Sequence, residues 1–167
     1  MKNNGLIATF IGHRDVYLSN STRKKIRKAL KETIESGVLT FYCGAQGAFD
    51  STCAVILKEL KEYFPTIKVY VVTPYFNESY LKELDLLVQD GYYDGIITPP
   101  IEHIPPKYAI LARNKYMIDK SIILFAYVDY SIGGAYATYK YAKNKKFIDI
   151  YNFGALEDAE LDDSLEN

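Results

Sequence analysis

The sequence predicts a single α/β domain in which a mainly parallel β-sheet has helices on both faces. Short apolar, β-prone runs alternate with longer amphipathic segments from end to end, which is the pattern of repeated strand–helix–strand units. Glycine-containing turns also follow three expected strands directly before a helix, at residues 12–15, 44–47 and 131–135. The carboxyl ends of parallel strands meet at one edge of a sheet, so these turns should lie together there.

In the first half of the chain, apolar runs give three strands and amphipathic segments give three helices. The first helix places Ile26, Leu30 and Ile34 on one face and ends at Gly37, whereas Pro65 ends the second helix. The strands are expected at residues 6–11, 38–43 and 67–73, and the helices at residues 21–36, 51–64 and 79–89.

The second half of the chain repeats this alternation. Two proline pairs separate a short strand from the next helix, and the run at 122–128 is the most apolar strand. The strands are expected at residues 95–98, 122–128 and 147–151, and the helices at residues 107–119 and 135–143. The complete order predicts a Rossmann-like, doubly wound sheet, whose ligands bind at the carboxyl ends of the strands.

Length and composition limit the class of protein. The chain has 167 residues, of which 49% are hydrophobic and 25% charged, enough for one globular domain with a buried core. Cys43 and Cys53 lack the spacing of a metal site, no secretory signal precedes them, and no apolar run is long enough to span a membrane. We therefore expect a cytoplasmic protein without membrane association and without a bound metal or cofactor.

Charge is distributed unevenly along the chain. The formal net charge is −1, but the last fourteen residues carry six acidic and no basic side chains. The preceding part, residues 1–153, has a net charge of +5, which suits an anionic ligand. We expect residues 1–153 to form the domain and residues 154–167 to form a solvated acidic tail.

The turn after the second expected strand is typical of a phosphate-binding loop. Gly44, Ala45 and Gly47 would let the backbone approach an anion, and the helix that follows would add N–H groups and the positive end of its dipole. Asp50 opens that helix. It is either a helix N-cap or a carboxylate that accepts hydrogen bonds from sugar hydroxyls.

The turn after the first strand carries Gly12, His13 and Arg14. A guanidinium suits a phosphate, and an imidazole donates or accepts a proton near neutral pH. Alternatively, His13 and Arg14 only cap carbonyl groups or pair with Asp15 at the surface. Before the last helix, Gly133 offers a second glycine turn together with its neighbour Gly134.

Arg113 is a candidate because of its position on the fourth helix. Helical spacing places it on the same face as Ile110 and Met117, which are apolar. Burying an unpaired guanidinium is costly. Arg113 should therefore meet either an internal acid, Asp119 or Asp129, or a bound anion.

Four segments together resemble the YpsA-like branch of the SLOG superfamily, over about residues 6–151. They are Thr-Phe-Ile-Gly-His-Arg at 9–14, Cys-Gly-Ala-Gln-Gly-Ala-Phe-Asp at 43–50, Ala-Arg-Asn-Lys-Tyr-Met-Ile-Asp-Lys-Ser at 112–121, and Gly-Gly at 133–134 with Tyr-Ala-Lys at 141–143. The superfamily has a Rossmann-like fold and includes LOG phosphoribohydrolases, the DNA-processing protein DprA and sensors of nucleotide-derived signals. The resemblance implies a nucleotide or nucleotide-derived ligand and a homodimer. In that case, Gly44, Gly47, Gly133 and Gly134 would form phosphate loops, and Arg113 would reach the phosphate or ribose.

The catalytic motif of the LOG enzymes is incomplete in this chain. Those enzymes carry Pro-Gly-Gly-x-Gly-Thr-x-x-Glu, whose glutamate takes part in catalysis, whereas residues 132–141 read Ile-Gly-Gly-Ala-Tyr-Ala-Thr-Tyr-Lys-Tyr. Cleavage of an N-glycosidic bond normally needs a carboxylate. The remaining candidates are Asp15, Asp50, Glu102 and Asp129. We therefore expect binding or sensing without turnover. The alternative is an N-glycosidic-bond hydrolase or transferase, LOG-like or deoxyribosyltransferase-like, with Asp50 or Asp129 as acid or base.

Two further features bear on the ligand. Tyr127, Tyr130 and Tyr136 surround the last glycine turn, where a ring could stack on a base. The first helix is basic, but no aromatic ladder or recognition-helix pattern accompanies it. From the sequence alone, nucleic acid is therefore not expected as a partner.

Overall fold

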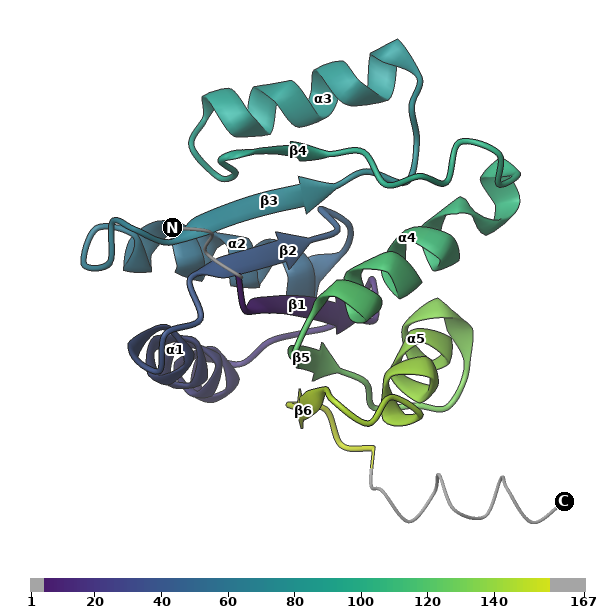
Figure 1. Ribbon diagram of the computed structural model, residues 1–167. Helices are drawn as coiled ribbons and strands as arrows, with labels where there is room; N and C mark the ends of the chain where they lie inside the picture. The colour runs from purple at the N-terminus through teal and green to yellow at the C-terminus, as the bar shows by residue number, and fades with distance from the viewer. Residues whose placement is uncertain (1–4, 157–167) are drawn as a thin grey trace, which may run out of the picture.

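A six-stranded parallel sheet forms the middle layer of the computed structural model, which describes residues 5–156 (Figure 1). The strands are β1 (Ile7–Gly12), β2 (Thr40–Cys43), β3 (Lys68–Val72), β4 (Gly95–Ile97), β5 (Ile123–Tyr127) and β6 (Asp149–Asn152). The helices are α1 (Asn20–Glu35), α2 (Ala48–Leu60), α3 (Glu78–Gln89), α4 (Pro106–Lys120) and α5 (Gly133–Lys143). The strand order is β4-β3-β2-β1-β5-β6, and all neighbouring pairs are parallel. The predicted doubly wound, Rossmann-like class is confirmed.

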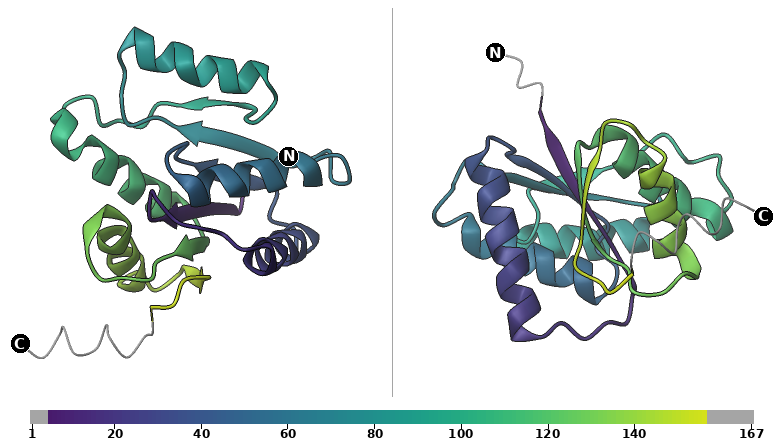
Figure 2. Two further views of the ribbon diagram at one scale, coloured as in Figure 1. Left: turned by 180° about the vertical axis from the view of Figure 1, so that it is seen from behind. Right: turned by 90° about the horizontal axis from the view of Figure 1, so that it is seen from below.

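The helices lie in two layers on opposite faces of the sheet. From β1 the chain steps outward through β2 and β3 to β4, and it then returns to the other side of β1 at β5. Because parallel crossovers are right-handed, this reversal places α1, α2 and α3 on one face and α4 and α5 on the other. The view from below in Figure 2 separates α1 and α2 from α4 and α5. The strand ends at the reversal, β1 and β5, border the site described below.

Stacked phenylalanines form the centre of the core on the α1–α2 face. Phe10 in β1 lies 6.2 Å from Phe41 in β2 and 5.6 Å from Phe125 in β5, measured between ring centroids. Phe49 in α2 packs onto Phe10 at 6.5 Å. All four rings are at most 1% exposed, and burying each one stabilises the fold by roughly 1.5–3 kcal/mol. The central strand is thus held on both sides by the same cluster.

Helix α2 begins at Ala48, three residues before the position expected from sequence. Gly47 is its N-cap, with a φ of 92° that favours glycine, and a side chain there would meet the backbone of Arg14 at 2.9 Å. Ala48 N donates to Arg14 O, which ties the start of α2 to the turn after β1. Asp50 therefore lies inside the first turn of α2 and is not its N-cap.

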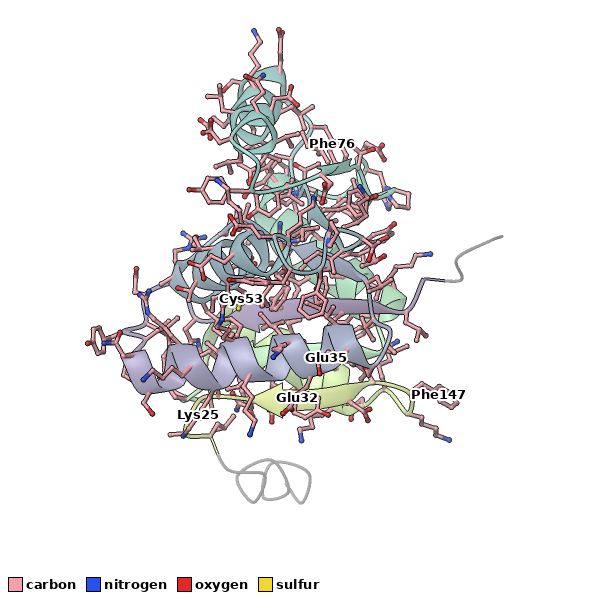
Figure 3. The ribbon with its side chains drawn as sticks, turned by 90° about the vertical axis from the view of Figure 1, so that its left-hand side faces the viewer. Lys25, Glu32, Glu35, Cys53, Phe76 and Phe147 are labelled. Carbon is pink, nitrogen blue, oxygen red and sulfur yellow. The ribbon has the colours of Figure 1, made fainter. Side chains whose placement is uncertain are left out.

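The outer face of α1 is charged. In Figure 3, which looks onto this helix, Lys25, Glu32 and Glu35 lie on the solvent side and Cys53 lies between α2 and the sheet. The N-terminus of α1 is capped by Ser19, whose Oγ accepts from Thr22 N at 3.1 Å. This cap starts the helix at Asn20, one residue earlier than expected.

The packed chain extends to Leu156, beyond the boundary at residue 153 expected from charge. Leu156 is 8% exposed, and its N donates to Val128 O at the end of β5. Gly154 N donates to Asn152 Oδ1. The acidic residues of the expected tail, 157–167, lie outside the described residues. Between residues 5 and 156, no helix has the length and apolar character needed to cross a bilayer.

Candidate functional site

A pocket of about 310 Å³ opens at the carboxyl ends of β1 and β5, where the chain reverses its direction across the sheet. This is the position at which doubly wound sheets bind ligands. Seven of the predicted ligand-binding residues line it: Gly12, His13, Arg14, Asp50, Arg113, Gly133 and Gly134. The other three, Gly44, Ala45 and Gly47, do not border the pocket. A contact between any of the ten and a ligand stays a prediction.

A carboxylate of the protein itself occupies the loop that follows β2. Asp50 is 7% exposed, and its Oδ2 accepts from Gly44 N at 2.9 Å. Successive N–H groups in such a turn form a concave site for an anion, and here that anion is Asp50. This geometry differs from the open phosphate loop expected from the glycines, because the internal carboxylate takes the place of a phosphate.

Arg113 lies buried beneath the same loop. It is 2% exposed, and four of the five N–H groups that a guanidinium carries donate to protein acceptors. Nη1 donates to Gly44 O at 2.9 Å and to Val72 O at 2.8 Å, Nε to Asn114 Oδ1 at 2.8 Å, and Nη2 to Gln46 Oε1 at 3.2 Å. Arg113 thus joins α4 to the ends of β2 and β3.

The charge that balances Arg113 is that of Asp50. Burial lowers the pKa of Arg113, and the Asp50 carboxylate provides the largest opposing effect. The two partners expected from sequence lie elsewhere. Asp119 accepts from Tyr141 Oη at 2.7 Å at the surface, and Asp129 lies beside His13. Helical spacing predicted the face on which Arg113 lies but not the residue opposite it.

The second carboxylate oxygen of Asp50 has no hydrogen-bond partner among residues 5–156. Its Oδ1 is buried and makes no hydrogen bond with any described residue. Burial raises the pKa of Asp50 to about 6, although Arg113 and the backbone N–H groups of Gly44, Gln46 and Ala45 lower it. An unsatisfied buried polar group destabilises a protein by about 1–3 kcal/mol. A ligand that donates an N–H or O–H group to Oδ1 would relieve this cost.

The contribution of Asp50 to the free energy of unfolding should be recognisable from its dependence on pH. A carboxyl whose folded pKa is above its unfolded value holds its proton more tightly when folded, so its contribution to stability falls as the pH rises from about 4 through about 6. The shift from 3.8 to about 6 corresponds to roughly 3 kcal/mol. We expect Asp50→Asn to gain up to that amount relative to the unsubstituted protein between pH 4 and pH 7, measured by urea unfolding.

The control is Asp85→Asn, which makes the same change at an exposed position of α3 outside the pocket. A constant difference for Asp50→Asn would show that Asp50 does not hold its proton in the folded protein.

His13 forms one wall of the pocket together with Tyr130. The ring of His13 is 4% exposed and stacks on Tyr130, with centroids 3.5 Å apart and 6° between the planes. Its Nε2 accepts from Asp129 N at 3.3 Å. Burial lowers the pKa of His13, and the Asp129 carboxylate, 3.4 Å from Nε2, opposes this effect. A neutral ring that accepts at Nε2 carries its proton on Nδ1, so His13 orders the turn after β5.

Two groups that attract anions are left free in the pocket. Helix α5 begins at Gly133 without a side-chain cap, so the N–H groups of its first turn lack partners within the helix. A side chain on Gly133 or Gly134 would meet nothing within 4 Å, which leaves the space above them open. The exposed side chain of Arg14 has no hydrogen bond or ion pair with any of residues 5–156. An anion at this end of the pocket would meet both.

A polar network that the sequence did not predict connects the two ends of the pocket. Asn114 accepts from Arg113 and donates from Nδ2 to Thr138 Oγ1 at 3.3 Å, and Thr138 Oγ1 donates to Gly134 O at 2.9 Å. Gln46 extends the network from Arg113 in the other direction, because its Oε1 accepts from Arg113 and its Nε2 donates to Tyr80 Oη at 3.3 Å. The signal that could have identified Asn114 is its position next to a buried arginine on one helix.

Comparison with known proteins supports the fold. The sequence matches no protein-family model and no curated protein sequence. The structure is similar to DNA processing protein A from Helicobacter pylori, with a TM-score of 0.58 and 16% sequence identity. The match covers 88% of this chain but only 64% of that chain. At this identity the likeness shows a shared Rossmann-like fold.

The same comparison corrects one expectation from the sequence. Nucleic acid was not expected as a partner, because no recognition pattern accompanies the basic first helix. The similar structure is described for its mode of binding single-stranded DNA. Nucleic acid therefore belongs among the ligands to be tested, and that expectation is wrong.

Proposed function

We propose that the pocket at the ends of β1 and β5 binds a nucleotide unit, either free or within a single-stranded nucleic acid. The observation that carries this proposal is that one pocket contains both an unsatisfied hydrogen-bond acceptor and unsatisfied hydrogen-bond donors. Within residues 5–156, Asp50 Oδ1 accepts no hydrogen bond, and no side chain caps the N–H groups at the start of α5. A nucleotide supplies both, because its sugar and base donate hydrogen bonds and its phosphate accepts them.

The arrangement gives the ligand a direction. The phosphate lies against the first turn of α5 and within reach of Arg14, where the helix dipole and the guanidinium both favour negative charge. The sugar or base extends toward Asp50. The pocket volume of about 310 Å³ lies at the lower end of the usual range for small ligands, roughly 300–1,000 Å³, and it suits a single nucleotide unit.

Two similarities support a nucleotide as the ligand. The sequence resembles the YpsA-like branch of the SLOG superfamily, and membership of that branch is part of this proposal. The similar structure belongs to a protein described as binding single-stranded DNA. The ligands of both groups contain a phosphate and a sugar.

Binding should depend on Arg14. We expect Arg14→Ala to weaken binding of a nucleotide by roughly tenfold to a hundredfold, since a hydrogen bond to a charged group contributes about 1.5–3 kcal/mol. The measurement is calorimetric titration with AMP, ADP-ribose and a short oligothymidylate. Tighter binding of the first two would identify free nucleotides as the ligands, and tighter binding of the third would identify single strands. The control is Arg27→Ala, which removes an arginine outside the pocket.

The proposal fails if none of the three compounds binds, or if Arg14→Ala and Arg27→Ala bind them equally. Gly134→Ala adds a second check, because a methyl group placed in the open space above α5 should hinder a bound phosphate.

A second candidate function is hydrolysis of the N-glycosidic bond of the bound nucleotide. The observation that favours it is the pKa of Asp50, raised to about 6 by burial, which suits a group that exchanges a proton near neutral pH. Release of free base from bound AMP, abolished in Asp50→Asn, would support it. Recovery of intact AMP would leave binding as the function of the site.

A further inference from the structure

The helical layer formed by α4 and α5 carries a strong excess of positive charge. The two helices lie side by side on one face of the sheet (Figure 1), and Lys145, just after α5, pairs with Asp119 of α4 at 2.9 Å. Asp119 is the one acidic residue in the segments 106–120 and 133–146. Seven exposed lysines in these segments form what we call the lysine face: Lys107, Lys115, Lys120, Lys140, Lys143, Lys145 and Lys146.

The opposite helical layer lacks this excess. Helices α1, α2 and α3 carry eight basic residues, six on α1 and one each on α2 and α3, and seven acidic residues, two each on α1 and α2 and three on α3. Opposite charges there pair with each other, as Arg27 does with Glu59. Five members of the lysine face have no ion pair with any of residues 5–156: Lys107, Lys115, Lys120, Lys140 and Lys146. A polyanion is therefore attracted to the α4–α5 side of the molecule.

Tyrosine rings accompany the lysines. Six of the seven ammonium groups lie over a tyrosine ring, 4.5–5.6 Å from its centroid. The rings are those of Tyr108, Tyr116, Tyr136, Tyr139 and Tyr141. Tyr108 is 53% exposed, and Tyr116, Tyr136 and Tyr141 are partly exposed. Contacts between cations and phosphates, together with stacking of bases on aromatic rings, are how proteins bind single strands of any sequence.

The lysine face continues from the candidate site. The start of α5 lines the pocket as far as Ala135, and the next residue is Tyr136, with Lys140 over its ring. Along the axis of α4, Lys107 and Lys120 are about 20 Å apart. A single nucleotide in the pocket therefore cannot reach the whole lysine face, whereas a strand with several phosphates can.

We infer that the lysine face and its tyrosines bind a single-stranded nucleic acid that runs from the pocket along α4 and α5. Phosphates contact the ammonium groups, and bases stack on the exposed sides of the rings. The inference deepens the proposed function, because it selects a strand over a free nucleotide as the ligand. Only the placement of one nucleotide of the strand in the pocket rests on that proposed function.

Oligothymidylate binding at several salt concentrations tests the lysine face. The triple variant Lys115→Gln, Lys120→Gln and Lys140→Gln removes three charges outside the pocket. We expect it to bind an oligothymidylate of about twelve nucleotides roughly tenfold to a hundredfold more weakly at low salt. The slope of log K against log salt concentration should become shallower by about 2, since each phosphate contact to a single strand contributes about 0.7. Fluorescence anisotropy of the labelled oligonucleotide measures both.

The matched control removes three exposed lysines of α1, and AMP separates this inference from the proposed function. The control variant is Lys24→Gln, Lys25→Gln and Lys28→Gln. It should change oligothymidylate binding much less, and both triple variants should bind AMP like the unsubstituted protein, because none of the six lysines lines the pocket. If AMP does not bind but the strand binds through the lysine face, the proposed pocket fails and this inference stands. If AMP binds and the two triple variants bind oligothymidylate equally, this inference fails and the pocket stands.

The tyrosines provide the second measurement. Tyr108→Leu removes an exposed ring and should weaken oligothymidylate binding by roughly fivefold or more. The control is Tyr63→Leu, which removes a ring that is 72% exposed after α2 and should leave binding unchanged. Equal effects of the two substitutions, tighter binding of a duplex of the same length, or lysine-dependent binding of phosphatidylserine vesicles without binding of the single strand would each overturn the inference.

Discussion

Replacing Arg113 with methionine is expected to lower the free energy of unfolding by about 3–5 kcal/mol, the effect of removing one partner from a buried ion pair. The substitution leaves Gly44 O and Val72 O without their donor and Asp50 without its balancing charge. Methionine has a similar length and is apolar, so little packing is lost. Urea unfolding at neutral pH measures the change.

The control for Arg113 lies two residues further along the same helix. Lys115 is exposed on α4, and Lys115→Met should change stability by less than about 0.5 kcal/mol. The loss in Arg113→Met should also be smaller at pH 5 than at pH 8, because a protonated Asp50 needs no cation beside it. Equal stability of the two variants, or a loss that does not depend on pH, would contradict a structural role for the Asp50–Arg113 pair.

Replacing Gly44 with alanine is expected to destabilise the protein by about 1–3 kcal/mol, the range for forcing an extra methyl group into a packed site. A side chain at this position would lie 2.9 Å from Asp50 Oδ2 and 3.1 Å from Arg113 Cζ. Both groups are held by hydrogen bonds to the same residue, so neither moves away without breaking one. Thermal unfolding and urea unfolding both measure the effect.

Gly134→Ala is the matched control for this prediction. Nothing lies within 4 Å of the added methyl group, and the position is the second residue of α5. Alanine favours a helix over glycine by up to about 1 kcal/mol, so this variant should be as stable as the natural sequence or slightly more so. If Gly44→Ala also left stability unchanged, the loop after β2 would have more room than the contacts indicate.

The fold could be predicted from the sequence because its signals are local. Apolar runs alternate with amphipathic segments, and proline and glycine mark where each run ends, so all six strands and five helices were expected near their observed positions. The boundaries differ where a backbone contact decides them. Helix α2 starts at Ala48 because Gly47 turns against Arg14, a contact between two loops that single-sequence patterns do not contain.

The site could be predicted only in part, because its partners are distant in sequence. The glycine turns and Arg113 were recognised from local patterns, and many of these residues do border one pocket. The bond between Arg113 and Gly44 O joins residues 69 positions apart. Helical spacing predicted that Arg113 needs a partner but not that Asp50 fills this place. The loop after β2 is thus filled by the Asp50–Arg113 pair of the protein itself. The N–H groups that remain accessible to a ligand lie at the start of α5.

The central position of β1 has a consequence for how the protein is made. β1 leaves the ribosome long before β5, which is one of its two neighbours, and His13 contacts Asp129, 116 residues later. Until that late segment arrives, one side of β1 is an unpaired edge open to other chains. The pocket is complete only when β5 has closed that edge. A ligand that binds this pocket would therefore contact both the early and the late part of the chain. It would stabilise fully synthesised, folded molecules and not incomplete chains.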